Sequence, residues 1–398
     1  MSNKTNNLRS VEIRNIMSLA MKPDIISFAG GMPDNNLLPV QDIDRIYHSL
    51  TLREKQTAMQ YSPTSGLPSL LQSLHNYLKE KGFPLKENKL LITTGSTQAI
   101  NILTKYFVNP NDPILVENPC FIGALSAFDS YQANIISIPL NEDGIDIEYL
   151  NNQLKKQKPK FIYLTPNFHN PAGILYSYKT KEKLIEKLQG LDIPIIEDDV
   201  YNELFFFEED KKHLKSIKEI NPEGIDVCYT GSFSKLLGPG LRLGWLLVPN
   251  HIYEECEIIK QSFDACSPSF TQVIADKFLR SGYVYNYIDK VKKEYRKRAK
   301  AMEKALKKHF PDYAKWVTPR GGFYFWIELP KNIDVTEVLK KSIEKGAVFV
   351  TGKTFDPEGK INNAFRISYS NSSIEKINEG IPIIAEAIKE VCEDISCT

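Results

Sequence analysis

The sequence predicts an α/β protein with a large, mostly parallel sheet between helices and a smaller α+β part near the C-terminus. The first observation is length, because 398 residues are enough for about two domains. The second is alternation: short apolar runs bounded by turn residues are separated by helical stretches, which is typical of parallel sheets. The third is a change after about residue 281, where a long charged helix is followed by alternating strands.

Seven apolar runs are expected to form the large sheet. They are Leu90–Thr93, Ile114–Val116, Ile135–Ile138, Phe161–Leu164, Ile195–Ile196, Val227–Tyr229 and Trp245–Val248. An amphipathic helix is expected at Ser69–Gly82, ending at a glycine suited to cap it, and another at Lys179–Gly190. Ligands of such sheets bind beyond the carboxyl ends of the strands, so we expect the chemistry just after these runs.

The expected domain organisation has three parts. Residues 46–280 form the large domain. Residues 281–398 form the small α+β domain, with a charged helix at Glu294–His309 and strands in the segments GGFYFWIEL, AVFV and AFRISYS. Residues 1–45 are expected to pack against the small domain and over the active site.

Composition favours a small-molecule substrate. The chain has 50 basic and 49 acidic residues, and its formal charge of +1 produces no field that attracts nucleic acid or an anionic membrane. The six cysteines lack the paired spacings of a zinc site or a disulfide framework, so we expect free thiols and no metal. The polar N-terminus lacks a signal-peptide core and no apolar run is long enough to span a bilayer, so we expect a cytoplasmic protein.

The segment TGSFSKLLGPGLRLGW, residues 230–245, is the most informative. It follows an expected strand and places Ser232, Ser234, Lys235 and Arg242 in a glycine-rich turn. Two hydroxyl groups and a guanidinium are typical ligands of a phosphate. Lys235 would then reach an aldehyde tethered by that phosphate and form a Schiff base, helped by a pKa that Arg242 and burial lower. An isolated S-x-S-K is more often a surface loop, so the interpretation depends on the rest of the chain.

A second anion contact is expected at the start of a helix. The segment TGSTQ follows the first expected strand and opens a helix at Gln98–Phe107, so the amides of Ser96 and Thr97 would face an anion at its N-terminus. The same residues are also a common helix cap without any ligand. Both readings remain open for this segment alone.

The segment IIEDDVY is expected to form a buried strand that ends in three acidic residues. Burial of these carboxylates is costly unless one of them meets a buried cation. A protonated pyridine nitrogen would be such a cation. Asp198 is the candidate partner, because a protonated ring is a better electron sink. Tyr201 would donate a hydrogen bond to the phenolate oxygen of the same ring.

Three further side chains are candidates for the same pocket. Asn170, in the segment NFHNPAG, can donate an amide hydrogen to the phenolate oxygen, although an Asn-Pro turn without a ligand is common. His169 is expected to be a loop residue. Phe121 can stack on a flat ring or simply pack in the core. Arg366 would bind a substrate α-carboxylate, with an internal salt bridge as the alternative.

The joint order of several motifs resembles a known family. The motifs are ISFAGGMPDNNLLP, MQYSPTSGLPSL, HNPAG, the D-x-x-Y of Asp198 and Tyr201, SFSKLLGPGLRLGW and FRISYS. Together they resemble the fold-type I aminotransferases of the aspartate aminotransferase superfamily. Within it, the branch with 2-aminoadipate, kynurenine and archaeal aromatic aminotransferases is the most similar.

The resemblance implies a cofactor, pyridoxal 5'-phosphate, and a role for each matching residue. Lys235 would bind the cofactor covalently and transfer the proton, while Asp198 would pair with the ring nitrogen. The phenolate oxygen would be bound by Asn170 and Tyr201, the ring would stack on Phe121, and Arg366 would bind the α-carboxylate. The implied phosphate contacts are Ser96, Thr97, Ser232, Ser234 and Arg242. Tyr61 resembles a tyrosine that reaches the phosphate from the neighbouring subunit, which implies a homodimer.

The implied reaction moves an amino group from an aromatic, aliphatic or 2-aminoadipate-like amino acid to a 2-oxo acid such as 2-oxoglutarate, by a ping-pong mechanism. Gly31 and Arg14 match the segment that closes over the substrate, where Arg14 would meet a distal carboxylate or else face solvent. A lyase or decarboxylase on the same fold is an alternative. A cofactor-sensing regulator is another, but such proteins carry a DNA-binding domain ahead of the resembling region, and here the resemblance starts within about twenty residues.

Overall fold

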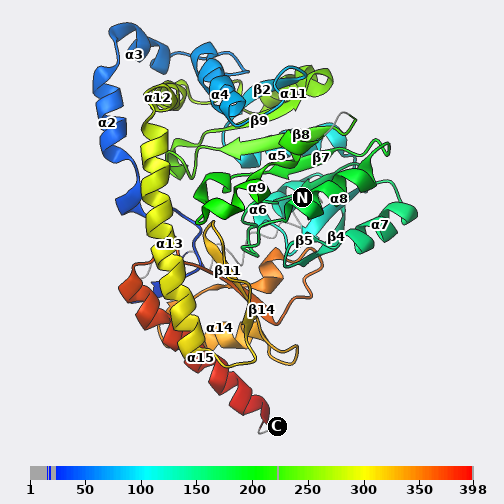
Figure 1. Ribbon diagram of the computed structural model, residues 1–398, viewed down its shortest axis with the longest axis vertical. Helices are drawn as coiled ribbons and strands as arrows, with labels where there is room; N and C mark the ends of the chain where they lie inside the picture. The colour runs from blue at the N-terminus through cyan, green and yellow to red at the C-terminus, as the bar shows by residue number, and fades with distance from the viewer. Residues whose placement is uncertain (1–15, 17, 19–23, 222–223, 397–398) are drawn as a thin grey trace, which may run out of the picture.

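The computed structural model describes residues 16, 18, 24–221 and 224–396. An eight-stranded sheet occupies its upper half in Figure 1, with strand order β2-β9-β8-β7-β6-β3-β4-β5. Every expected run is one of its strands: β2 (Asn88–Thr93), β3 (Pro113–Asn118), β4 (Asn134–Asn141), β6 (Ile162–Leu164), β7 (Ile195–Asp198), β8 (Val227–Ser232) and β9 (Gly244–Pro249). The eighth is the two-residue edge strand β5 (Gly144–Ile145). The expected α/β class is confirmed.

The sheet is mixed but mostly parallel. Strands β4, β3, β6, β7 and β8 run parallel to one another, whereas β9 is antiparallel to β8 and β2. The carboxyl ends of β3, β6, β7 and β8 therefore meet at one edge of the sheet. Any side chains that follow these strands are brought together there.

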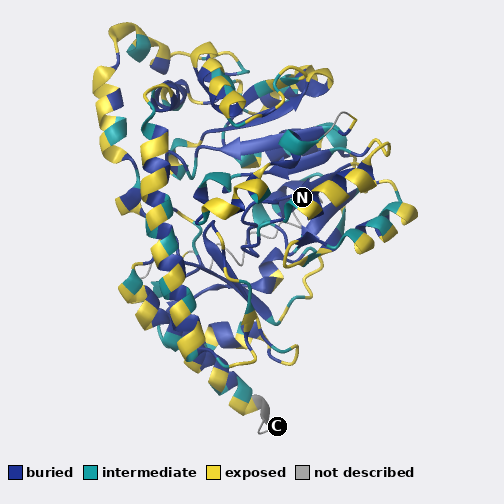
Figure 2. Cartoon of the chain, in the orientation of Figure 1, coloured by how far each residue is buried: buried dark blue, intermediate teal, exposed yellow. Residues whose placement is uncertain are grey.

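Helices bury both faces of this sheet. They are α4 (Pro68–Glu80), α5 (Ser96–Phe107), α6 (Ile122–Ser130), α7 (Ile147–Lys156), α8 (Tyr178–Leu188), α9 (Lys211–Leu214), α10 (Ile217–Ile220), α11 (Tyr253–Asp264) and α12 (Ser269–Arg280). Successive strand residues enter different cores: Leu115 and Ile195 belong to one apolar cluster, and Val116 and Ile196 to the other. Figure 2 shows the buried strands between helices whose outer faces are exposed. This two-sided burial explains why the strands are continuous apolar runs.

A four-stranded antiparallel sheet lies in the lower half of Figure 1, with order β10-β11-β14-β13. Its elements are β10 (Lys315–Trp316), β11 (Tyr324–Glu328), α14 (Val335–Glu344), β13 (Val350–Thr351), β14 (Ala364–Ser368) and α15 (Ile374–Ser396). Helix α13 (Tyr283–His309) spans both halves. It begins earlier than the expected Glu294, because its apolar stripe of Val284, Tyr287 and Val291 already faces the core.

The segment that precedes the large sheet joins the small one. Strand β1 (Ile26–Ser27) pairs in parallel with β12 (Ala347–Val348), and the Ser368 amide donates to the Phe28 carbonyl at 2.8 Å. Arg298 on α13 forms an ion pair with Asp34 at 2.5 Å. Helices α2 (Val40–Ser49) and α3 (Leu52–Met59) then cross the flank of the molecule to α4 (Figure 1).

Short 3-10 helices complete the chain trace. They are η2 (Asn35–Leu37), η3 (Asn202–Leu204), η4 (Glu208–Asp210), η5 (Pro239–Leu241), η6 (Asn250–Ile252) and η7 (Gly352–Phe355). Across the described residues, every helix is too short or too polar to cross a bilayer.

Candidate active site

A cavity of about 310 Å³ lies where the carboxyl ends of the large sheet face the small sheet and the segment after β1. Most of the candidate residues line it, although they come from distant parts of the sequence. They are Gly31, Ser96, Thr97, Phe121, Asn170, Asp198, Tyr201, Ser232, Ser234, Lys235, Arg242 and Arg366. The candidate residues that follow the apolar runs are therefore brought together in one cavity.

Two candidates are not among the described residues that line this cavity. Tyr61 is 84% exposed and lies outside the residues that line it. Arg14 lies outside the described residues. The roles of both remain predictions.

The phosphate candidates surround the end of β8 and the start of α5. The Ser234 amide and hydroxyl both contact the Ser232 hydroxyl, at 3.0 and 2.9 Å, which fixes the turn that carries Lys235. Arg242 adopts a left-handed backbone conformation with φ of +48°, a costly state for a side-chain-bearing residue. Its guanidinium donates to the Thr94 carbonyl at 3.4 Å, beside the N-terminus of α5.

Gly95 makes this close approach possible. A Cβ at this position would lie 3.0 Å from Arg242 Nη2, and its φ of +86° suits glycine. Helix α5 can therefore present its first amides next to the guanidinium. Partial positive charge from the helix and full charge from Arg242 act on the same place, which favours a phosphate.

Lys235 is placed to react as a neutral amine. Its Nζ donates to the Gly31 carbonyl at 2.8 Å and lies over the rings of Tyr201 and Phe323, at 5.5 and 5.1 Å from their centroids. Burial, followed by the charges of Arg366 and Arg242, lowers the pKa of Lys235 to about 7. An amine with a pKa of about 7 is about half unprotonated in neutral solution, and the unprotonated form can attack a carbonyl.

The three carboxylates at the end of β7 have different environments. Glu197 accepts from the amides of Ile217 and Lys218, at 2.8 and 3.0 Å. Asp199 accepts from the side chains of Asn167, Asn202 and Tyr229. Asp198 differs, because only its Oδ2 is bonded, while its Oδ1 is buried with no hydrogen-bond partner among the described residues. Asp198 is thus the carboxylate with an oxygen left for a ligand.

Arg366 reaches the cavity from β14 without an internal salt bridge. It donates to Asn170 Oδ1 at 2.7 Å and to the Ala29 carbonyl at 2.6 Å, between the rings of Tyr324 and Phe355. Within the described ranges, no carboxylate forms an ion pair with it, and its Nε has no hydrogen-bond partner. The salt-bridge alternative therefore does not hold there, and the guanidinium can take an external anion.

Tyr324 is a cavity residue that the sequence analysis missed. Its hydroxyl lies 2.9 Å from that of Tyr201, and a Cβ on Gly31 would come within 1.9 Å of it. Gly31 thus lets the segment after β1 lie directly against Tyr324. The residue was missed because the pattern GGFYFWIEL is typical of a core strand. Nothing in the sequence distinguishes Tyr324 from the aromatic residues beside it.

A buried network that the sequence analysis also missed fixes the loop after β6. Glu117, at 0% exposure, accepts from the Thr165 amide, from Tyr176 at 2.5 Å and from His169 Nε2 at 3.0 Å. The Ala172 amide donates to His169 Nδ1, so the ring proton sits on Nε2. These bonds hold both ends of the loop that carries Asn170. His169 is a loop residue, as expected, with a definite structural contact.

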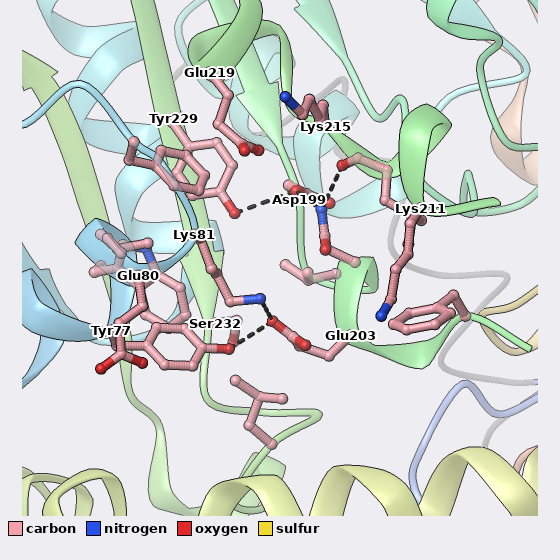
Figure 3. Close-up of a pocket in the computed structure, with 18 residues that line it drawn as sticks. Tyr77, Glu80, Lys81, Asp199, Glu203, Lys211, Lys215, Glu219, Tyr229 and Ser232 are labelled. Carbon is pink, nitrogen blue, oxygen red and sulfur yellow. Dashed lines mark hydrogen bonds and ion pairs between the residues drawn. The ribbon is translucent and has the colours of Figure 1, made fainter. Parts of the chain in front are cut away.

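A second cavity of about 450 Å³ lies beside the first and shares Val200 and Ser232 with it. Several of its polar groups are already paired (Figure 3): Tyr77 and Lys81 both contact Glu203, and Tyr229 donates to Asp199. One side-chain atom of its lining, Trp245 Nε1, is buried without a hydrogen-bond partner among the described residues. The cavity that contains Lys235 has two such atoms, Asp198 Oδ1 and Arg366 Nε.

The chain matches the family described as aminotransferase class I and II over residues 23–384. It belongs to this family. Aromatic-amino-acid aminotransferase 1 of Thermococcus litoralis is 36% identical over 395 residues, 98% of this chain and 94% of the relative. The kynurenine aminotransferase of Pyrococcus horikoshii, crystallised with PMP, is 36% identical with a TM-score of 0.94, covering 98% of this chain and 97% of that one.

A third relative is an α-aminoadipate aminotransferase of Thermus thermophilus, solved with N-(5'-phosphopyridoxyl)-L-leucine. It is 31% identical with a TM-score of 0.91, covering 99% of this chain and 98% of that one. The enzyme is therefore a pyridoxal-phosphate-dependent aminotransferase of fold type I. The residues of the cavity fit the cofactor: Asp198 has an open oxygen for a protonated ring nitrogen, Arg242 is available for a phosphate, and Lys235 has an amine suited to an aldehyde.

The buried Asp198 predicts a pH-dependent stability of the cofactor-free protein. Burial raises the pKa of Asp198 to about 7. The folded protein therefore keeps a proton that the unfolded chain loses near pH 4, and stability falls as the pH rises from about 4 to 7. The fall is up to about 4 kcal/mol and stops above pH 7.

Urea unfolding of the cofactor-free wild type and of Asp198→Asn tests this expectation. The wild type should lose stability relative to the variant over that pH range, and saturating pyridoxal phosphate should remove the loss. A stability difference that does not change with pH would show that the carboxyl group is already ionised in the empty cavity.

Proposed function

We propose that this aminotransferase acts on amino acids with aromatic and aliphatic side chains, and on 2-aminoadipate-like ones, with 2-oxo acids such as 2-oxoglutarate as acceptors. The observation that carries the assignment of roles is the convergence of Lys235, Asp198 and Arg366 on one cavity, each with an atom free for a ligand. The amine of Lys235 matches an aldehyde, and the buried carboxylate of Asp198 matches a ring cation. The buried guanidinium of Arg366 matches an α-carboxylate.

The proposed mechanism assigns each residue a task. The chemistry supplied by bound pyridoxal phosphate is withdrawal of electrons from the substrate Cα. Lys235 Nζ would hold the cofactor covalently, and as a free amine it would accept the proton that leaves the substrate Cα. Asp198 Oδ1 would hold the ring nitrogen protonated. Arg366, supported by Asn170, orients the α-carboxylate so that Cα faces Lys235.

Tyr201 and the Asn170 amide hydrogen would bind the phenolate oxygen, and Phe121 would cover one face of the ring. Ser96, Thr97, Ser232, Ser234 and Arg242 would bind the phosphate. All of them line the same cavity, which supports these roles.

Replacement of Lys235 tests the catalytic proposal. Borohydride reduction in the presence of pyridoxal phosphate should label Lys235 in the wild type, with a labelling rate that rises through pH 7 as the amine loses its proton. Lys235→Ala should give no label and lower turnover at least about 10³-fold, because the covalent link and the proton transfer are both lost. Lys81→Ala, a lysine of the second cavity, is the matched control and should retain both.

A panel of amino donors with 2-oxoglutarate as acceptor defines the substrate class. Formation of a 2-oxo acid from phenylalanine, leucine and 2-aminoadipate is expected. If none of these donors gave a 2-oxo acid, the proposed substrate class would be wrong.

The cations of the cavity indicate how dicarboxylates are recognised. Among the described residues that line it, the cationic ones are Lys235, Arg242 and Arg366, and each already has a proposed partner. Apolar side chains such as Met32 and Ile122 also line it, which suits aromatic and aliphatic substrates. A distal carboxylate, including that of 2-oxoglutarate, needs a further cation, and we propose Arg14.

Arg14→Ala should therefore separate the two substrate groups. The KM for 2-oxoglutarate and 2-aminoadipate should rise about tenfold, the loss expected for one charge-assisted hydrogen bond, while the KM for phenylalanine stays within twofold. An equal effect on both groups would contradict a contact with the distal carboxylate. Arg45→Ala, an exposed arginine on α2, serves as the control.

We further propose a cytoplasmic homodimer in which residues 46–280 form the large domain, 281–398 the small domain and 1–45 a segment over the active site. Large apolar side chains are exposed on α2, on α3 and on α12, which packs against both: Val40, Tyr47, Leu52, Met59 and Phe270. Such a group of exposed side chains is typical of a subunit interface. A second copy seated there would allow Tyr61 to reach the phosphate of its neighbour.

Introducing charged residues at exposed apolar positions of α3 tests the proposed dimer. Leu52 and Met59 are 75% and 88% exposed, so Leu52→Glu/Met59→Glu should leave the fold of one chain intact. In sedimentation velocity the double variant should run as a monomer with weakened cofactor binding, while the wild type runs as a dimer. Leu191→Glu, on an exposed residue away from α3, should behave as the wild type. A fully active wild-type monomer would contradict the proposal.

A further inference from the structure

Asp198 has a single hydrogen-bond donor among the described residues. The Tyr163 hydroxyl donates to Oδ2 at 2.8 Å, and Oδ1 has no partner. The adjacent carboxylates of Glu197 and Asp199 each accept from two or more donors. The orientation of the Asp198 carboxylate therefore depends on one phenol.

Tyr163 is itself firmly held. It lies on β6 between Val116 of β3 and Ile196 of β7, and its side chain is 0% exposed. Its ring packs edge-on against Phe128, with the centroids 5.4 Å apart. The hydroxyl is thus fixed by the sheet and not by the loops around the cavity.

The Tyr163 hydroxyl also keeps its proton. Burial, followed by the charge of Asp198, raises the pKa of Tyr163 well above its usual value. The group therefore remains a donor across the working pH range. A hydroxyl that donates to a carboxylate binds the ionised form more strongly than the protonated form.

We propose that Tyr163 is the positioning residue for Asp198: its hydroxyl occupies Oδ2, directs Oδ1 into the cavity and stabilises the ionised carboxylate that faces the ring nitrogen of the cofactor. This inference rests on the role proposed for Asp198. Tyr163 does not contact the reacting atoms and acts through Asp198 alone.

The second cavity supplies a matched control. Tyr77 is also buried and also donates to a carboxylate, Glu203, at 2.6 Å (Figure 3). Tyr163→Phe and Tyr77→Phe each remove one phenol–carboxylate bond and leave the ring. Their effects on folding are therefore comparable, whereas only the first bond involves Asp198.

The experiment compares pyridoxal phosphate affinity in the wild type and both variants at pH 8. Tyr163→Phe should weaken cofactor binding about tenfold, the loss expected for a hydrogen bond to a charged group, and Tyr77→Phe less than twofold. With ¹⁵N-labelled cofactor, the ring-nitrogen resonance should move from its protonated position toward the neutral one only in Tyr163→Phe. A purely structural role would not shift this signal.

A double-mutant cycle shows whether Tyr163 affects cofactor binding through Asp198. In an Asp198→Asn background, Tyr163→Phe should change cofactor affinity less than twofold, because the partner is already lost. If Tyr163→Phe does not fold, replacement of Tyr163 by 4-aminophenylalanine, which keeps a donor at the same place, should preserve both the affinity and the resonance.

Each outcome is decisive. Wild-type affinity and an unshifted resonance in Tyr163→Phe would overturn the positioning role, as would an undiminished effect in the Asp198→Asn background. Loss of affinity when Tyr163 is replaced by 4-aminophenylalanine would also overturn it. Failure of the wild type to bind pyridoxal phosphate would instead overturn the proposed function.

Discussion

Burial of Asp198 with one unpaired oxygen sets the chemistry of the cavity. An ionised carboxylate in this place is unstable without a cation, which is why burial raises the pKa of Asp198 to about 7. For Lys235 the charged form is also disfavoured, since burial and two arginines lower its pKa to about 7. A ligand with a cationic ring and an electrophilic carbon relieves both costs, so the cavity is complementary to pyridoxal phosphate.

Arg366 links three parts of the chain that line the cavity. It is carried by the small sheet, donates to Asn170 on a loop of the large sheet, and donates to Ala29 in the segment after β1. The hydrogen bonds of Glu117 fix the loop that carries Asn170. A substrate carboxylate bound at Arg366 therefore adds a contact at the point where all three parts meet, and the geometry of Cα relative to Lys235 depends on how they are packed.

Much of this arrangement could be predicted from the sequence, because parallel strands buried on both faces are apolar runs and the residues after them are polar. Asp198, Asn170 and Lys235 all follow such runs. Tyr163 and Tyr324 could not be found in this way, since they lie inside strands and resemble core residues. Glu117 ends a strand, as Asp198 does, yet its loop partners only become visible in three dimensions. The early start of α13 was missed because aromatic residues weaken its helical pattern.

The two cavities show why unsatisfied groups locate a site better than size does. The larger one contains lysines, tyrosines and carboxylates, but Glu203 is already bonded by Tyr77 and Lys81. In the smaller one, Asp198 Oδ1 and Arg366 Nε have no partner within the described chain. Burial of an unpaired polar atom is tolerated only where something else supplies the partner. The same reasoning assigns Tyr163 its importance: by occupying Oδ2 it determines which oxygen of Asp198 is left for the ligand.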